Sequence, residues 1–275
     1  MSRPLKSIVY WLLLAPLVVV ILFPYAVMLS TAVKPKDEIF RFPPQWLPDT
    51  IRLQNFSDMW TTVRFGEALW NSLVVSVAAA VVCLLIAIPA AYALGRLRFK
   101  GEGLYRQFLL VTQMLSPIVL VIGIFRLMAS LGLLDRLWSL VLTYGAFNLA
   151  FAVWMLQSYF ATIPKELEEA AWIDGASRTQ ALTRVFLPMA TPAMAVTGIF
   201  VFVYSWNEFV LALTLLRSPE NYTLPLRVFS LVGGAYRVDW DFVMAAALLA
   251  TLPAAILFAW LQRYLVGGLS LGAVK

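Results

Sequence analysis

The chain of 275 residues contains no histidine and a single cysteine, Cys83. Zinc sites, imidazole proton relays and cysteine–histidine nucleophile pairs depend on these side chains, so the sequence offers poor support for an enzyme. An internal disulfide is excluded, because it needs two cysteines. Charged residues make up 13% of the chain, where soluble domains carry about 25%.

The chain also lacks the phosphate-binding pattern Gly-x-x-x-x-Gly-Lys-Ser/Thr. We therefore expect it to bind no cofactor and to depend on another protein for any ATP hydrolysis. Its net charge of +6 would suit nucleic acid, but the lysines and arginines are scattered over every loop and form no stripe. A lipid bilayer surface, and no nucleic acid, is the expected partner of this charge.

Long apolar runs dominate what is present, and hydrophobic residues reach 61% of the chain. About 20 apolar residues cross a bilayer core, and the runs lack the alternation of transmembrane β-strands. Helices are then the remaining way to satisfy the backbone in lipid. We predict an all-α integral membrane protein, one transmembrane domain over 1–275 with six transmembrane helices. The expected spans are approximately 8–32, 69–95, 107–126, 137–160, 190–215 and 242–262.

Six spans place both termini on the same side of the membrane. Basic residues are divided almost evenly between the two sides, so counting them does not decide the orientation. The connection 95–106, GRLRFKGEGLYR, concentrates basic residues directly at the helix ends, where the positive-inside rule is strongest. We therefore predict that both termini are cytoplasmic.

The densest acidic cluster lies in the segment 162–190, between two apolar runs. Pro164 suits the start of a helix, and the following glutamates favour its positive dipole end, which predicts a helix over 165–173. Gly175 permits a turn, and Ser177 is a candidate N-cap for a second helix through about Phe186. The residues alone favour an ordinary solvated helical hairpin that joins two spans over a specific interaction element.

The spacing of Glu169-Ala170-Ala171, Gly175 and Val185-Phe186-Leu187-Pro188 resembles the EAA loop of binding-protein-dependent ABC transporter permeases. That pattern is EAA, three residues, glycine, nine residues, isoleucine, one residue and Leu-Pro. Every fixed position matches except that Val185 replaces the isoleucine. The resemblance implies a cytoplasmic coupling-helix loop between helices 4 and 5, which docks on a separate ABC ATPase dimer that binds ATP and magnesium.

The resemblance also implies which residues couple this chain to the ATPase. Small residues allow close approach, the glycine allows the turn to enter a cleft, and the Leu-Pro pair ties the second small helix rigidly to the fifth span. The implied ATPase-coupling residues are Glu169, Ala170, Ala171, Asp174, Gly175, Val185, Leu187 and Pro188.

Further segments look like the carbohydrate-uptake branch of these permeases, the maltose-type second permease. They are 25–40, 53–56, 89–94 and 268–275. This likeness implies a sugar or polyol substrate, a second permease subunit that is a different homologous chain, and an extracytoplasmic solute-binding protein. The expected location is the inner membrane of a bacterial or archaeal cell.

Glu208 is the only acidic side chain inside an expected span, and such charges usually face a bundle interior or a watery cavity. Trp206 and Asn207 beside it could stack on and hydrogen-bond a sugar. Our hypothesis is that these three residues line or brace the translocation path, the alternative being a structural hydrogen bond between helices. A stand-alone secondary transporter or channel for a small polar solute is the alternative function, but it leaves the segment 162–190 without a role.

Overall fold

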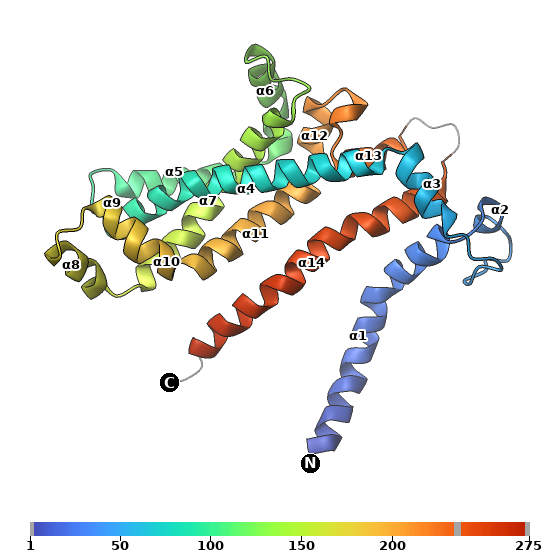
Figure 1. Cartoon of the computed structure of the whole chain (residues 1–275), viewed down its shortest axis with the longest axis horizontal. Coiled ribbons are helices and arrows are strands. Elements are labelled where there is room, and N and C mark those ends of the chain that lie inside the picture. Colours follow the sequence, from blue (N-terminus) through green and yellow to red (C-terminus); the bar gives the residue numbers. More distant parts are fainter. Residues whose placement is uncertain (1–2, 234–237, 273–275) are drawn as a thin grey trace. The chain divides into compact units, whose positions relative to one another are not determined.

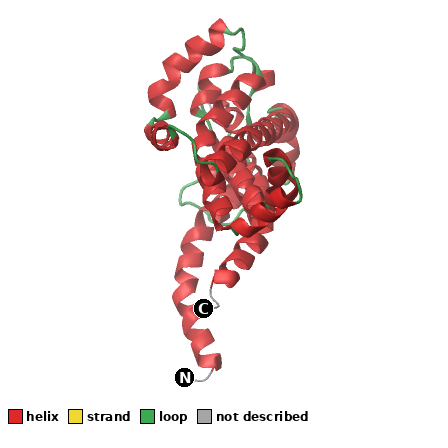
Figure 2. Cartoon of the chain, turned by 90° about the vertical axis from the view of Figure 1, so that its left-hand side faces the viewer, coloured by secondary structure: helices red, strands yellow, loops and turns green. Residues whose placement is uncertain are grey.

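The computed structural model describes residues 3–233 and 238–272, and every regular element in that part of the chain is a helix (Figure 1, Figure 2). The prediction of an all-α chain is therefore confirmed. The last residues of the 268–275 segment, Ala273–Lys275, lie outside the described residues. The elements are α1 (Arg3–Ala32), α2 (Lys36–Ile39), α3 (Gln54–Thr62), α4 (Phe65–Arg96), α5 (Glu102–Met114), α6 (Pro117–Ser130), α7 (Leu137–Thr162), α8 (Lys165–Ile173), α9 (Arg178–Ala181), the π-helical turn η1 (Leu182–Phe186), α10 (Leu187–Met189), α11 (Thr191–Asn207), α12 (Val210–Leu215), the 3-10 turn η2 (Pro219–Asn221), α13 (Leu224–Ser230) and α14 (Trp240–Gly272).

Several of these helices are long and apolar enough to cross a membrane. Four qualify by themselves: Trp11–Ala32, Phe65–Arg96, Leu137–Thr162 and Trp240–Trp260. Two bent pairs qualify when each is counted as one span: Glu102–Met114 with Pro117–Ser130, and Arg178–Met189 with Thr191–Asn207. The described chain thus holds four to six candidate spans, which makes it a multi-pass membrane protein.

The structure differs from the expected span 107–126, where the chain bends by 99° between α5 and α6. The bend occurs directly before Pro117, which begins α6. A proline disfavours helical geometry in the residue before it, and Ser116 has an extended ψ of 135°. The proline therefore ends one helix and starts the next.

The expected span 190–215 is also interrupted, because α11 ends at Asn207 and α12 begins at Val210. Glu208 between them is extended, with ψ of 130°. Its carboxylate accepts hydrogen bonds from the backbone N–H groups of Leu211 and Ala212, at 3.0 and 3.3 Å. The first N–H groups of a helix need such acceptors, so Glu208 stabilises the new start of α12.

By packing, the chain divides into two compact units. The first comprises Met1–Glu67 and Arg227–Leu252, and the second comprises Ala68–Leu226 and Pro253–Lys275. The single domain over 1–275 stays a prediction. In the first unit, buried Asn55 donates to the carbonyls of Ala32 and Lys34 at 2.9 and 2.8 Å, which fastens α3 to the end of α1.

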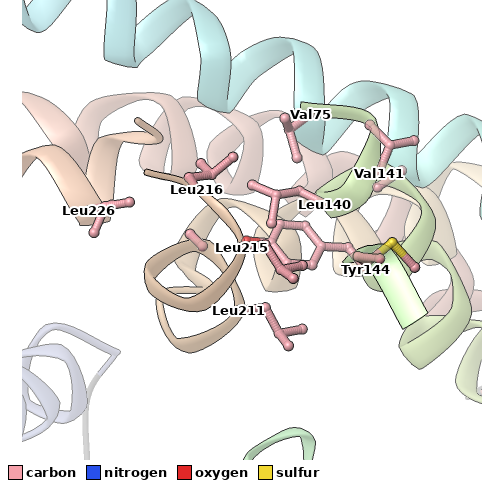
Figure 3. Close-up of a cluster of buried hydrophobic side chains, with 11 residues drawn as sticks. Val75, Leu140, Val141, Tyr144, Leu211, Leu215, Leu216 and Leu226 are labelled. Carbon is pink, nitrogen blue, oxygen red and sulfur yellow. The ribbon is translucent and has the colours of Figure 1, made fainter. Parts of the chain in front are cut away.

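The second unit is built around α7, which packs against α5, α6, α11 and α12. Tyr144 of α7 is fully buried in a hydrophobic cluster with side chains from α4 and α12 (Figure 3). The cluster includes Val75, Leu140, Val141, Leu211, Leu215, Leu216 and Leu226. In a bilayer, helices are held together by close van der Waals packing, and this cluster supplies such packing between α12 and α7 despite the chain break before α12.

Two hydrogen bonds join α4 to other segments of the chain at widely separated points. Asn71 donates to the carbonyl of Glu220 at 2.7 Å, whereas the hydroxyl of Tyr92 donates to Glu168 at 2.7 Å. At 1.5 Å per residue, these positions lie roughly 30 Å apart along the helix, about the thickness of a bilayer core. The connection 216–223 and helix α8 therefore lie at opposite ends of a candidate span.

Asp135 lies between α6 and α7 and stabilises the connection 216–223 through hydrogen bonds. Its carboxylate accepts from the backbone N–H groups of Arg217 and Ser218, each at 2.9 Å, and also from the Ser218 hydroxyl and the Asn221 amide. Burial alone would raise the pKa of Asp135, but these hydrogen bonds outweigh it and hold the pKa well below its usual range.

We expect Asp135→Asn to destabilise the folded chain by about 1 kcal/mol at neutral pH, because it weakens these charge-assisted hydrogen bonds. A carboxylate with a lower pKa in the folded than in the unfolded state stabilises the fold at pH values above its unfolded pKa of about 3.9. This stabilisation is lost as the pH falls below that value. The deficit, measured by thermal unfolding in detergent, should therefore shrink below about pH 4. Asp58→Asn, which removes an exposed carboxylate 3.5 Å from Arg52, is the matched control. Equal unfolding temperatures of wild type and Asp135→Asn at neutral pH would contradict this role.

Candidate functional site

The segment 162–190, called the docking segment below, forms the local structure predicted for it. Helix α8 spans Lys165–Ile173, with Pro164 at its N-cap and glutamates in its first turn. Gly175 follows with φ of 81°, in the left-handed region that glycine adopts without strain. Ser177 forms a capping box with Gln180, their two hydrogen bonds measuring 2.7 and 3.3 Å. The second predicted helix is α9 continued by the π-helical turn η1.

One side of the docking segment presents apolar groups to its surroundings. The side chain of Ile173 is 86% exposed and that of Trp172 45% exposed, next to the turn at Gly175. A side chain at Gly175 would meet no atom within 4 Å. Contiguous apolar patches mark interaction surfaces, and these two adjacent side chains form a small patch on a helix outside the candidate spans. Among the predicted coupling residues, Glu169, Ala170, Asp174, Gly175 and Pro188 are exposed, and Ala171, Val185 and Leu187 are partly buried.

The other side of the docking segment is anchored by a glutamate that the sequence interpretation missed. Glu168 is 5% exposed and accepts the 2.7 Å hydrogen bond from Tyr92 of α4, whereas the predicted Glu169 is exposed. A buried carboxylate needs such a partner. Because Tyr92 and Glu168 lie 76 positions apart, no local sequence pattern pairs them.

An aromatic cluster lies beside this anchor. Phe160 and Phe186 are fully buried and form edge-on contacts with each other and with Tyr92, at centroid distances of 5.1 to 6.5 Å. The guanidinium of Arg96 lies 4.9 Å from the centroid of the Phe186 ring. It also donates to the carbonyls of Phe160, at 2.6 Å, and Ile163, which caps the C-terminal end of α7. The docking segment is thereby fixed to both α4 and α7.

The connection from the docking segment to the next span contains the Leu187-Pro188 pair, whose rigid coupling role stays a prediction. The chain bends by 78° between Met189 and Thr191. Phe186, at the end of the π-helical turn, and Ala190 are fully buried here, while Pro188 is exposed. The aromatic anchor therefore precedes the Leu-Pro pair.

The three residues predicted for the translocation path face different surroundings. Glu208 accepts a 2.8 Å hydrogen bond from the hydroxyl of Tyr144, which joins the α11–α12 break to α7. Trp206 is 3% exposed and stacks on Phe202 with ring centroids 5.5 Å apart. Asn207 is exposed and donates to the carbonyl of Val203 at 2.8 Å. Glu208 thus makes the interhelical bond that the sequence left as an alternative.

Residues 86–270 match the family described as the inner membrane component of binding-protein-dependent transport systems. The chain belongs to this family. It is 36% identical to the inner membrane ABC transporter permease protein YcjP of Escherichia coli, over 100% of this chain and 98% of that protein. It is 38% identical to the diacetylchitobiose uptake system permease protein DasC of Streptomyces coelicolor, over 93% and 92% of the two chains.

A solved structure supports the same assignment. The fold superposes with a TM-score of 0.81 and 25% identity on a chain of a bacterial ABC transporter that imports the acidic polysaccharide alginate, covering 96% of this chain and 98% of that one. The resemblance inferred from the docking segment is therefore confirmed. The chain is a permease subunit of a binding-protein-dependent ABC importer, and it is a transport subunit, not an enzyme.

Proposed function

We propose that this chain forms half of the translocation path of an ATP-driven importer for a sugar or polyol. The observation that carries the proposal is the docking segment, with an exposed apolar turn at Trp172–Gly175 and a buried anchor between Glu168 and Tyr92. Relatives named for diacetylchitobiose and for trehalose and maltose uptake, at 38% and 36% identity, support the class of cargo.

The proposed assembly contains a second permease subunit of a different chain, an ABC ATPase dimer and an extracytoplasmic solute-binding protein. ATP and magnesium bind to the ATPase, and this chain holds neither. The six spans leave both termini and the docking segment, between the fourth and fifth spans, in the cytoplasm of a bacterial or archaeal cell. The connection 216–223, at the opposite end of α4, then faces the binding protein.

Within this assembly, the proposed coupling residues are those of the docking segment that match the EAA pattern. The exposed turn enters a cleft on the ATPase, and the buried anchor carries its displacement to α4 and α7 as a rigid-body movement. For the path, we propose a bracing role for Glu208, supported by its bonds to Tyr144 and α12, together with Trp206 and Asn207.

Reconstitution tests this function. The two permeases and the ATPase are placed in proteoliposomes with the binding protein outside, and uptake of labelled neutral mono- and disaccharides is measured. Uptake should require both ATP inside and the binding protein outside. An ATPase with its phosphate-loop lysine substituted is the control and should abolish uptake. Full uptake by this chain alone, without ATP, would instead establish the stand-alone transporter.

A further inference from the structure

The break between α5 and α6 borders a cavity of about 350 Å³ in the second unit. Its walls come from α5, the start of α6, α7 and α11. Three phenyl rings, two amides and one phenol give it its chemical character. These are Phe147, Phe151 and Phe200, then Gln113 and Asn148, and then Tyr204. We call it the amide cavity.

Asn148 is the deepest polar group of the amide cavity, since it is only 6% exposed. One N–H of its amide donates to the carbonyl of Tyr144 at 2.8 Å. An amide offers two donors and one acceptor oxygen, and no hydrogen bond joins the Asn148 oxygen to another residue in the described chain. Since this oxygen is not among the fully enclosed side-chain atoms of the described chain, it can accept a hydrogen bond from a ligand that enters the cavity.

Two further polar groups of the cavity are able to form hydrogen bonds with a ligand. Neither the Gln113 amide nor the Tyr204 hydroxyl makes a hydrogen bond within residues 3–233 and 238–272. The rings of Phe151 and Phe200 meet edge to face with centroids 5.8 Å apart, forming an apolar corner. The lining therefore combines several hydrogen-bonding groups with flat apolar surfaces, the usual composition of a small-molecule site.

No lysine, arginine, aspartate or glutamate is among the described residues that line the cavity. A charged ligand would lose its hydration there without gaining a counter-charge, which is strongly unfavourable. A neutral ligand with many hydroxyls and apolar ring faces satisfies both parts of the lining. The volume lies near the lower end of the roughly 300–1,000 Å³ of ligand pockets, which suits one or two sugar rings.

We propose that the amide cavity binds a neutral mono- or disaccharide unit of the cargo, with Asn148 and Gln113 bonded to hydroxyls and the phenyl rings against the apolar ring faces. This inference rests on the proposed function and adds a contact site within this chain. It excludes uronic acids and other anionic sugars as ligands of the cavity. It also moves the expected sugar contacts away from Trp206.

The test uses the reconstituted complex and compares the KM and maximal rate of ATP-driven uptake. Asn148→Leu, which keeps the branching and the number of heavy atoms and removes the amide, should raise the KM for the neutral sugar at least tenfold with little change in maximal rate. Gln113→Leu changes an exposed position and should raise the KM several-fold. Gln157→Leu, on α7 but outside the cavity lining, is the matched control and should keep the wild-type KM.

Unchanged KM values in both cavity variants would overturn the proposal and indicate that the partner permease fills the cavity. Equally efficient uptake of glucuronate, with the same dependence on Asn148, would also overturn it. If Asn148→Leu fails to assemble, the Gln113→Leu result decides. Failure of the proposed function is distinct, because the wild-type complex would then show no ATP-driven uptake of any neutral sugar.

Discussion

Gly175→Trp is expected to abolish ATP-driven uptake and to reduce co-purification of the ATPase at least tenfold, while the permease stays folded. Gly175 has φ of 81°, and a non-glycine residue in this region costs about 1–2 kcal/mol, too little to unfold the chain. Because nothing lies within 4 Å of the site of a Cβ, the indole would project outward from the exposed turn. It would then keep that turn from entering a cleft on the ATPase.

The experiment measures ATPase recovered with the affinity-tagged permease, alongside uptake in proteoliposomes. Gly132→Trp is a matched control, because Gly132 also has a positive φ, 66°, and no neighbouring atom within 4 Å. It lies between α6 and α7, outside the docking segment. Similar losses in both variants would assign the effect to backbone strain. Retention of the ATPase by Gly175→Trp would remove the docking role from this turn.

The docking segment shows what a sequence determines locally. Helix α8 begins after Pro164 and ends before Gly175, as predicted, and Ser177 caps the next helix. These features depend on residues only a few positions apart, whose preferences are legible in one sequence. The resemblance to the EAA pattern then supplied the function, which the local preferences alone left open.

Features that depend on distant residues were not predictable in this way. Hydropathy predicted a continuous span at 107–126, yet Pro117 interrupts it, because hydropathy carries no information on backbone geometry. In the sequence Asn148 is a single amide in an apolar run, and only packing of α5, α7 and α11 places it in a cavity. No local pattern distinguishes the buried Glu168 from the exposed Glu169, since Tyr92, the partner of Glu168, is remote in the sequence.

The bond between Tyr92 and Glu168 carries the second large expected effect. Tyr92→Phe leaves a buried carboxylate without its donor, and removal of one partner of such a bond costs about 1–3 kcal/mol, or more for a charged group. We expect α8 to separate from α4, so that ATP hydrolysis continues but uptake falls about tenfold, the equivalent of 1.4 kcal/mol. Hydrogen exchange of the α8 amides should rise in parallel.

Replacing both partners distinguishes the effect of an unpaired buried carboxylate from the effect of losing the hydrogen bond. In Tyr92→Phe/Glu168→Leu the pair becomes apolar, and such a change is nearly neutral for stability. Uptake and slow exchange in α8 should then recover relative to Tyr92→Phe alone. Glu166→Leu, which removes an exposed carboxylate from the same helical turn, should behave as wild type. If Tyr92→Phe leaves both uptake and exchange unchanged, the displacement of the docking segment must reach the spans through Phe186 and Arg96 instead, because these also join it to α4 and α7.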